Sequence, residues 1–175
     1  MKTKNIRFLT MAGVIANLLA APVANSQTEG FSASLGGENE VPPINTVGTG
    51  AFEMTIQGTD ITFSLTFSDL SPPLTVSHLQ FAPSKVAGGV MIFLCGGGGQ
   101  PACPAATSGT ITGTITAANV TGPSGQGIAP GDLDSALEAV RNDLSYANMH
   151  TTNFAGGEIR GQVRRGLGHG SDGSP

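Results

Sequence analysis

The chain has 175 residues, of which 11% are charged, and its 12 acidic and 8 basic side chains give a formal net charge of −4. This acidic balance, with few and scattered cations, argues against nucleic acid and anionic membranes as partners. The 26 glycines and 11 prolines are typical of a β-rich extracellular domain. The length suits one domain with a sizeable core.

The N-terminal segment has the pattern of a secretory leader. Lys2, Lys4 and Arg7 precede a largely apolar run over 8–19, and small residues follow it. A retained membrane anchor is the alternative, but the run is short and interrupted, whereas a spanning helix needs about 20 apolar residues. We therefore predict a signal peptide over 1–26 and an exported mature chain, secreted, periplasmic or at the cell surface, with no membrane span. Without the leader the net charge would be about −7.

Alternation of apolar and polar residues predicts a series of short β-strands in the rest of the chain. An opening strand at 31–35 is followed by a loop with two prolines at 36–43. Residues 52–57 and 61–67 form the clearest hairpin, because each has one apolar and one polar face. Further strands are predicted at 74–81, at the unbroken apolar run 89–95, which suits the middle of a core, and at 110–116. Strands of this spacing, separated by glycine and proline, predict an all-β antiparallel sandwich or barrel.

A single short helix is predicted before the last strands. Its apolar residues share one face, since they are spaced four, three and four apart: Leu133, Leu137, Val140 and Leu144. Asp132 is positioned to cap the free amides, and Glu138 and Arg141 lie three apart on the wetter side. We expect this helix to close one side of the sandwich rather than to bind a partner.

The segment after this helix predicts a closing hairpin. Two stretches with period-2 alternation, 146–151 and 158–163, flank the turn Phe154-Ala155-Gly156-Gly157. The two glycines supply the positive φ that a tight turn needs.

The second strand of this hairpin divides its side chains between two faces. We expect Ile159 and Val163 to face the core. Glu158 and Arg160 then belong to a polar cluster on the opposite face. The planar guanidinium of Arg160 suits a loop carbonyl or a carboxylate, and we interpret it as a structural lock rather than a ligand contact. The carboxylates considered as its partners are Glu38 and Glu40.

Four segments, in order, resemble the CHRD domain, the repeat module of chordin. They are 31–43, with its acidic pair before a double proline, Gly50-Ala51-Phe52, His78, and the closing signature at 146–151 and 157–162. We therefore predict a CHRD domain over 27–166. The residues at 167–175 show no periodicity and are expected to form a disordered tail. The resemblance implies an immunoglobulin-like β-sandwich, similar to that of copper/zinc superoxide dismutase.

The chain departs from the family's pattern at a position with chemical consequences. Where the family tends to carry His-x-His, the residues here are His78-Leu79-Gln80, and Gln80 lacks the imidazole that transition metals prefer. His78 and His150 both lie on predicted strands and could meet, but they are only weak candidates for a metal site. The third partners on offer are poor: Gln80, Asn148 and Glu158. We expect no cofactor, no tightly bound copper and no superoxide dismutase activity.

The residues predict no catalytic machinery, because neither a Ser-His-Asp set nor a nucleophile paired with a base has a recognisable context. The family has no settled activity, and chordin itself is an extracellular antagonist that binds growth factors. Our hypothesis is a non-enzymatic extracellular binding or adhesion module, whose partner is an unknown extracellular protein or surface ligand. A weak metal-binding domain similar to superoxide dismutase and a structural surface protein are the alternatives. The candidate binding surface comprises the motif residues His78, Gln80, Asn148, His150, Thr151, Glu158 and Arg160.

Two cysteines in an exported chain predict one disulfide. Cys95 and Cys103 bracket a glycine-rich loop, and oxidising compartments preserve such a bond. A metal site or a catalytic thiol is the alternative, but no histidine and no second cysteine pair lies nearby in the sequence.

A candidate glycosylation site is also present, because Asn119-Val120-Thr121 is a sequon that can be glycosylated in a eukaryotic secretory route.

Overall fold

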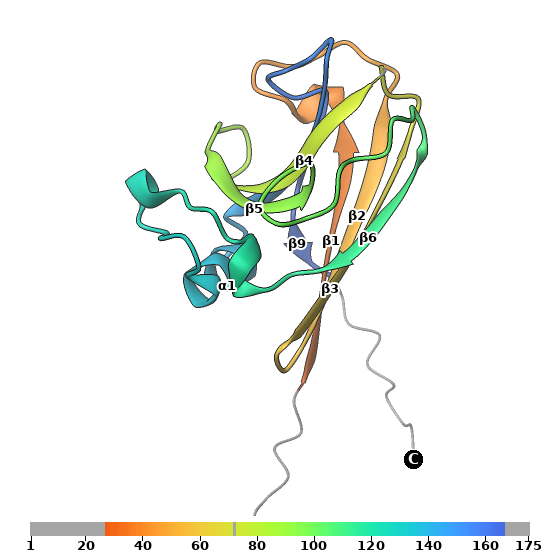
Figure 1. The fold of residues 1–175 in the computed structure, drawn as a ribbon. Helices are drawn as coiled ribbons and strands as arrows, with labels where there is room; N and C mark the ends of the chain where they lie inside the picture. Colours follow the sequence, from red (N-terminus) through yellow and green to blue (C-terminus); the bar gives the residue numbers. More distant parts are fainter. Residues whose placement is uncertain (1–26, 72, 167–175) are drawn as a thin grey trace, which may run out of the picture.

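The computed structural model describes residues 27–71 and 73–166 (Figure 1). The predicted leader at 1–26 and the predicted tail at 167–175 lie outside the described residues. Within the described chain, β-strands predominate, with one α-helix and three short 3-10 helices. No helix in this part of the chain is long and apolar enough to cross a membrane.

The strands and the helix occur where the sequence pattern predicts them, with ends that differ by a few residues. One short strand at the C-terminal end, β9, has no counterpart among the predicted elements. In chain order the elements are β1 (Thr28–Gly36), η1 (Gly37–Asn39), β2 (Thr49–Gln57), β3 (Asp60–Ser68), β4 (Leu74–Phe81), β5 (Gly89–Cys95), β6 (Gly109–Thr114), η2 (Ala117–Asn119), η3 (Ser124–Gln126), α1 (Leu133–Arg141), β7 (Ser145–Thr151), β8 (Ile159–Gln162) and β9 (Arg164–Arg165).

All the strands belong to one antiparallel sheet, which curls until it is nearly a barrel (Figure 1). The hydrogen-bonded order is β5-β4-β7-β8-β1-β2-β3-β6, and β9 pairs with β1. The predicted hairpins β2–β3 and β7–β8 are both formed. The antiparallel all-β class, with one short helix before the closing hairpin, is therefore confirmed.

The hydrophobic core fills the inside of the curled sheet. Alternate residues of each strand point into it, so that Phe52 of β2 pairs with Leu65 of β3, and both are completely buried. Burying a side chain of this size stabilises the fold by about 1.5–3 kcal/mol. Ile159 and Val163 also face the core, as predicted, and neither has measurable exposure.

Strand β5 lies at one end of the hydrogen-bonded order, yet it is buried in the core as its unbroken apolar run predicts. The strand is buried because the segment after β6 covers its outer edge. Thr121 N donates a hydrogen bond to Met91 O at 2.9 Å, and Ile92 forms an isolated β-bridge with Val120. A run of apolar residues thus indicated burial correctly, but it did not indicate the strand's place in the sheet.

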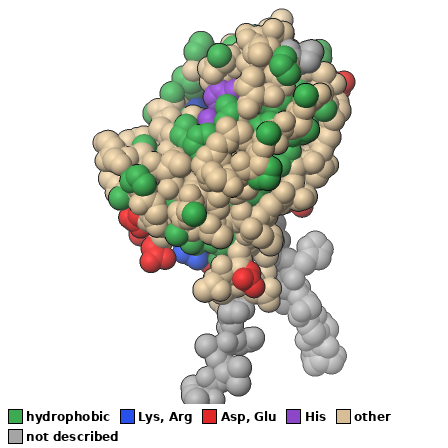
Figure 2. Space-filling view, in the orientation of Figure 1, with side chains coloured by type: hydrophobic (Ala, Val, Ile, Leu, Met, Phe, Trp, Pro, Cys, Tyr) green, Lys and Arg blue, Asp and Glu red, His purple; other side chains and the backbone are tan. Residues whose placement is uncertain are grey.

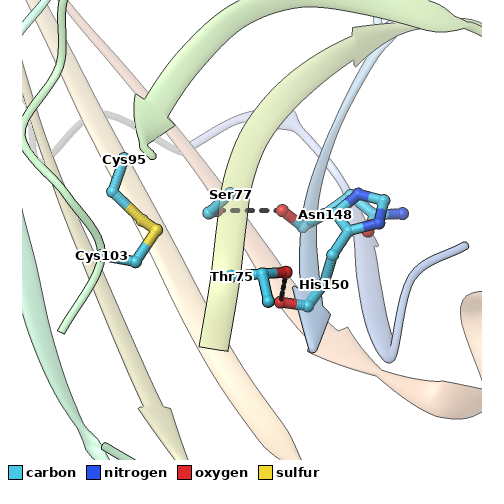
Figure 3. Close-up of a disulfide and its surroundings, with 6 residues drawn as sticks. All are labelled: Thr75, Ser77, Cys95, Cys103, Asn148 and His150. Carbon is cyan, nitrogen blue, oxygen red and sulfur yellow. Dashed lines mark hydrogen bonds between the residues drawn. A yellow bond between two sulfur atoms is a disulfide. The ribbon is translucent and has the colours of Figure 1, made fainter. Parts of the chain in front are cut away.

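The predicted disulfide between Cys95 and Cys103 is present and ties the end of β5 to the following loop (Figure 3). The two Cα atoms are 5.0 Å apart. Gly96 N donates to Pro101 O at 2.8 Å, so the loop turns back tightly on itself. The glycines with positive φ in this loop are Gly96, Gly98 and Gly99.

Helix α1 is capped and buried as its sequence predicts. The Asp132 side chain accepts a hydrogen bond from Ser135 N at 3.1 Å, which satisfies one of the free amides of the first turn. Leu137 and Val140 are buried in the core cluster. The helix therefore packs its apolar face against the sheet.

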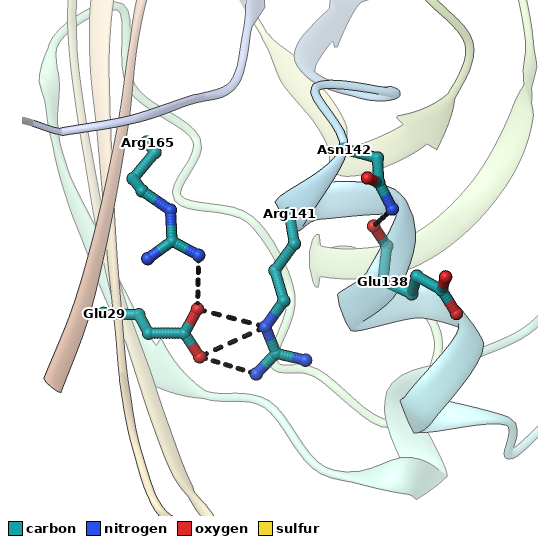
Figure 4. A network of polar contacts seen from close by, with 5 residues as sticks. All are labelled: Glu29, Glu138, Arg141, Asn142 and Arg165. Carbon is teal, nitrogen blue, oxygen red and sulfur yellow. Dashed lines mark hydrogen bonds and ion pairs between the residues drawn. The ribbon is translucent and has the colours of Figure 1, made fainter. Parts of the chain in front are cut away.

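Arg141 of α1 reaches across to β1 rather than along its own helix to Glu138. Its guanidinium donates three hydrogen bonds to the Glu29 carboxylate: a terminal nitrogen lies 2.7 Å from one oxygen, and Nε lies 3.1 Å from each of the two oxygens (Figure 4). Arg165 of β9 donates to the same carboxylate at 2.7 Å. These partly exposed groups tie α1, β1 and β9 together, with a contribution of about 1 kcal/mol or less per pair.

Candidate functional site

The motif residues of the closing hairpin lie on the outer face of the sheet, opposite the core. The strand register places His78 opposite Asn148 and Asn148 opposite Arg160. An outer sheet face is ordinarily wet, but here each of these side chains is at most 7% exposed. We call the group the signature face: His78, Tyr146, Asn148, His150 and Arg160.

Three loops bury the signature face, and we call them the loop cap: residues 37–48, 82–88 and 152–157. The first and third lie side by side at the top of Figure 1, where the loop after β1 meets the turn between β7 and β8. The first and second are joined by Lys85, whose Nζ donates to the Glu38 carbonyl oxygen at 3.1 Å. The cap turns the outer face into a second, polar interior.

His78 and His150 face each other within the signature face. Their ring centroids are 4.5 Å apart, with the planes tilted by 58°. Burial, with a smaller effect of the neighbouring His150 ring, lowers the pKa of His78 to about 3. Burial also lowers the pKa of His150, although its hydrogen bond with Ala155 opposes the shift. Both rings are therefore neutral at pH 7.

The strand register shows where Gln80 lies relative to the two histidines. This residue pairs with Tyr146, whereas Val76 pairs with His150, so Gln80 and His150 lie on opposite sides of His78 along β4. The imidazole that faces His78 comes from the neighbouring strand β7. The expectation that His78 and His150 could meet is thus confirmed.

Glu40 of the loop cap points its carboxylate at the signature face and is only 5% exposed. Its Oε2 accepts a hydrogen bond from Asn148 Nδ2 at 3.3 Å. Burial raises the pKa of Glu40 to about 7, although the Asn148 hydrogen bond and the charge of Arg160 oppose the shift. Glu40 therefore changes its charge near neutral pH.

Arg160 contacts both an aromatic ring and a loop carbonyl. Its guanidinium carbon lies 3.4 Å from the centroid of the Tyr146 ring, and its terminal nitrogen donates to the Pro83 carbonyl oxygen at 3.2 Å. Of the expected partners, the loop carbonyl is confirmed. Neither Glu38 nor Glu40 forms an ion pair with it in the described chain.

Glu158 does not join the signature face, which differs from the expectation that it clusters with Arg160. It is completely buried at the end of the barrel, where its carboxylate accepts hydrogen bonds from three other segments. Burial raises the pKa of Glu158, but these hydrogen bonds outweigh that effect and leave the pKa below its ordinary value. The donors are Ser71 Oγ at 2.5 Å, Thr46 Oγ1 at 2.8 Å, Thr151 Oγ1 at 2.8 Å and Ser71 N at 3.0 Å. Thr151, another motif residue, thus belongs to this structural carboxylate site.

Buried polar atoms without a hydrogen-bond partner gather at the signature face. Leaving such an atom unsatisfied costs about 1–3 kcal/mol, so a group of them requires an explanation, such as a bound water, ion or ligand. In the described chain these atoms are Glu40 Oε1, His78 Nδ1, Ser145 Oγ, Asn148 Oδ1, His150 Nε2 and Gln162 Oε1. Only the Ser145 and Gln162 atoms lie outside the signature face and its Glu40 contact.

A pocket of about 250 Å³ opens into the loop cap beside Glu40. Gly157 forms part of its wall with a φ of +125°, and a Cβ there would lie 2.6 Å from Glu40 Oε1 and 2.8 Å from Asn148 Oδ1. Only glycine allows this close approach. The residues that line the pocket are Glu40, Val41, Pro42, Ile44 and 153–157.

Two further sequence hypotheses can be placed in the structure. The candidate glycosylation residue Asn119 is buried, and its Nδ2 donates to Gly98 O at 2.9 Å, so the folded protein does not present this nitrogen to a glycosylating enzyme. Among the described residues, no group of three or more His, Cys, Asp or Glu side chains is placed to hold a metal ion.

Sequence reasoning indicated Glu40 only indirectly, as a candidate partner of Arg160. The available signal was an acidic pair in front of two prolines. No local pattern distinguishes the carboxylate that turns inward from the one that stays in water. Tyr146 was likewise recognised as part of a strand but not as the ring on which Arg160 lies.

The fold and the site define a disulfide-bonded all-β domain in which a loop cap buries a polar signature face. The family model of the CHRD domain matches residues 31–163, which include most of β1, all of β2 to β8 and the whole signature face. The chain therefore belongs to the CHRD domain family. No curated protein and no solved structure matches it.

Proposed function

We propose that this protein is a non-enzymatic binding module that works outside the cytoplasm, and that the loop cap is its binding surface. The observation that carries the proposal is the position of the exposed apolar residues. The large hydrophobic side chains exposed in the described chain are Val41 (40%), Val47 (81%) and Val86 (49%), and all three lie on the loop cap. That the loop cap carries the large apolar side chains exposed in the described chain favours an interaction site on these loops.

The pocket in the loop cap indicates which chemical group the partner presents. Its walls carry apolar side chains such as Val41, Ile44 and Phe154, while Glu40 adds a carboxylate with an unpartnered oxygen. A lysine side chain matches both features, since it has an apolar stem and an ammonium group that donates hydrogen bonds. The partner we propose is an extracellular protein that inserts a lysine into this pocket.

The arrangement of the reactive side chains supports a role without catalysis. Both cysteines are consumed by the disulfide. The unpartnered nitrogens of His78 and His150 have no hydroxyl or thiol within hydrogen-bond distance. A general base that activates a nucleophile needs such a contact.

The disulfide supports export, because these bonds persist in oxidising compartments. Fractionation of the producing cells, with N-terminal sequencing of the exported protein, tests this; we expect the mature chain to begin near Gln27.

The nearly closed antiparallel sheet supports the finer assignment of an immunoglobulin-like fold related to superoxide dismutase. Superposition of an experimental structure on both folds tests that assignment.

The lysine pocket can be tested by nuclear magnetic resonance with a small probe. We expect Nα-acetyl-lysine amide to cause saturable shifts of the backbone amides at 40–44 and 153–157 in the ¹⁵N-labelled protein. Nα-acetyl-norleucine amide, which has the same stem without the amine, should cause much smaller shifts. Equal responses to the two probes would contradict the proposal.

A pair of matched variants assigns the binding to one carboxylate. Glu40→Gln removes the carboxylate in the pocket, while Glu53→Gln removes an exposed one on the outer face of β2. We expect only Glu40→Gln to abolish the response to the lysine probe. Retained binding of the lysine probe by Glu40→Gln would show that Glu40 does not recognise the ammonium group.

A further inference from the structure

The two histidines of the signature face have an arrangement that a purely structural role leaves unexplained. His78 and His150 are 5% and 7% exposed, and their rings lie 4.5 Å apart between centroids. His78 Nδ1 and His150 Nε2 are both buried without a hydrogen-bond partner. Neither ring therefore satisfies the other, although each has a nitrogen in need of a partner.

The protonation of His150 follows from its one hydrogen bond. Its Nδ1 lies 3.0 Å from the carbonyl oxygen of Ala155. A carbonyl can only accept, so Nδ1 carries the proton and Nε2 holds a free lone pair. A backbone carbonyl that fixes one ring nitrogen while the other stays free is the arrangement of metal-binding histidines in general.

We propose that His78 and His150 together bind one divalent transition-metal ion, with Cu²⁺ bound most tightly. His150 contributes Nε2, and His78 contributes Nδ1 in the tautomer that carries its proton on Nε2. Water completes the coordination, because the described chain offers no third His, Cys, Asp or Glu. The site is separate from the lysine pocket, and the inference does not rest on the proposed function.

The number of protein ligands decides which metal the site favours. Zinc sites in proteins use three or four side-chain ligands, which this pair does not supply. Imidazole nitrogen suits copper and nickel as well as zinc, and at a given site Cu²⁺ binds more tightly than Ni²⁺ or Zn²⁺. A site with two imidazoles should therefore exchange its metal readily and select Cu²⁺.

The unpartnered ring nitrogens favour binding, and the two rings lie close to the protein surface. Each ring has a nitrogen without a hydrogen-bond partner, so no hydrogen bond within the protein has to be broken when a metal binds. Figure 2 shows histidine atoms, in purple, at the surface beside hydrophobic side chains. Because His78 Nδ1 and His150 Nε2 are themselves buried, the loop cap must open locally for a hydrated ion to reach them.

The test is a Cu²⁺ titration of the purified protein, made without a histidine tag, by calorimetry and electron paramagnetic resonance. We expect one equivalent to bind with nitrogen coordination, and His78→Gln and His150→Gln each to weaken binding by at least about tenfold. His169→Gln is the matched control, since it removes the chain's remaining histidine, and it should leave the binding unchanged. Binding that survives in both signature-face variants, or that is lost in His169→Gln, would overturn the proposal.

A measurement on the unmodified chain covers the case in which a variant fails to fold. With ¹⁵N-labelled histidine, substoichiometric Cu²⁺ should broaden two of the three imidazole signals, and His169→Gln identifies the third. Broadening confined to the His169 signal, or equal broadening of all three, would refute the two-histidine site.

Discussion

The Arg160 guanidinium lies 3.4 Å above the Tyr146 ring, and this contact joins strands β7 and β8 beneath the loop cap. Both residues also hold the same loop. Arg160 donates to Pro83 O at 3.2 Å, and the Tyr146 hydroxyl accepts from Gly88 N at 3.1 Å. The pair therefore fixes both ends of the loop at 82–88 to the sheet. A desolvated cation–π contact contributes about 2 kcal/mol.

Arg160→Lys should lower the stability of the protein although it keeps the charge. Lysine cannot both stack flat on Tyr146 and donate to Pro83 O with a planar fork, so we expect a loss of about 1–3 kcal/mol. Chemical denaturation measures this loss. Arg164→Lys is the control, because that side chain is 51% exposed and should change stability little. An unchanged melting temperature, combined with lost binding of the lysine probe, would make Arg160 a ligand contact instead.

Reduction of the Cys95–Cys103 disulfide should destabilise the protein by about 2.5 kcal/mol on the chain-entropy description of a nine-residue loop. The loop has several glycines, whose freedom in the unfolded state is large. Denaturation curves with and without a reducing agent measure the difference. The Cys95→Ser, Cys103→Ser double variant should match the reduced protein and should not respond to the reducing agent. Two free thiols in the native protein, found by alkylation and mass spectrometry, would contradict the bridge.

The sequence predicted the strands well because burial on one face forces a period of two. Phe52, Ile159 and Val163 point inward as their alternation requires. Sheet order could not be predicted in the same way, since pairing is a contact between distant segments. The apolar run of β5 shows this, because it indicates burial without saying that a later segment covers the strand's edge. Ion pairs cannot be predicted locally either, because Arg141 pairs with Glu29 of β1 rather than with Glu138 of its own helix.

The candidate site was predicted as a set of residues but not as a geometry. Family resemblance selected His78, Asn148, His150 and Arg160, and the register places them on one face. Their burial was not foreseeable, because alternating polar residues normally indicate a solvated face. Here the loop cap covers these polar side chains and excludes solvent from them. It is held by contacts between backbone carbonyls and side chains, which leave no periodic pattern in the sequence.

The charge of Glu40 should make stability depend on pH in a defined direction. Its pKa rises from an ordinary 4.5 to about 7 in the folded protein, so the folded state holds the proton more tightly than the unfolded chain. The stability that protonated Glu40 contributes is complete below about pH 4.5 and is lost as the pH rises through about 7. Relative to Glu40→Gln, the wild-type free energy of unfolding should fall over this window by at most about 1.4 kcal/mol per pH unit.

Urea denaturation of the wild type and Glu40→Gln across this pH range measures the difference, and the comparison cancels the contributions of all other titrating groups. A difference that stays constant from about pH 4 to about pH 8 would contradict the raised pKa. Binding of the lysine probe should strengthen over the same interval, because deprotonation of Glu40 creates the charge that the ammonium group needs.

Two adjacent glycines in the β7–β8 turn should respond very differently to a single added methyl group. At Gly157 the φ is +125°, and a Cβ would lie 2.6 Å from Glu40 Oε1 and 2.8 Å from Asn148 Oδ1. Gly157→Ala should therefore destabilise the protein by about 1–3 kcal/mol through backbone strain and displacement of these side chains. At Gly156 nothing lies within 4 Å of an added Cβ, so Gly156→Ala should change stability by less than about 1 kcal/mol. Thermal unfolding of both variants measures the contrast.

The binding assay tests the same contrast, because a side chain at 157 displaces Glu40 and should abolish the response to the lysine probe. Equal melting temperatures for the two variants would mean that the turn relaxes without cost, and that the contact between Gly157 and Glu40 does not shape the pocket.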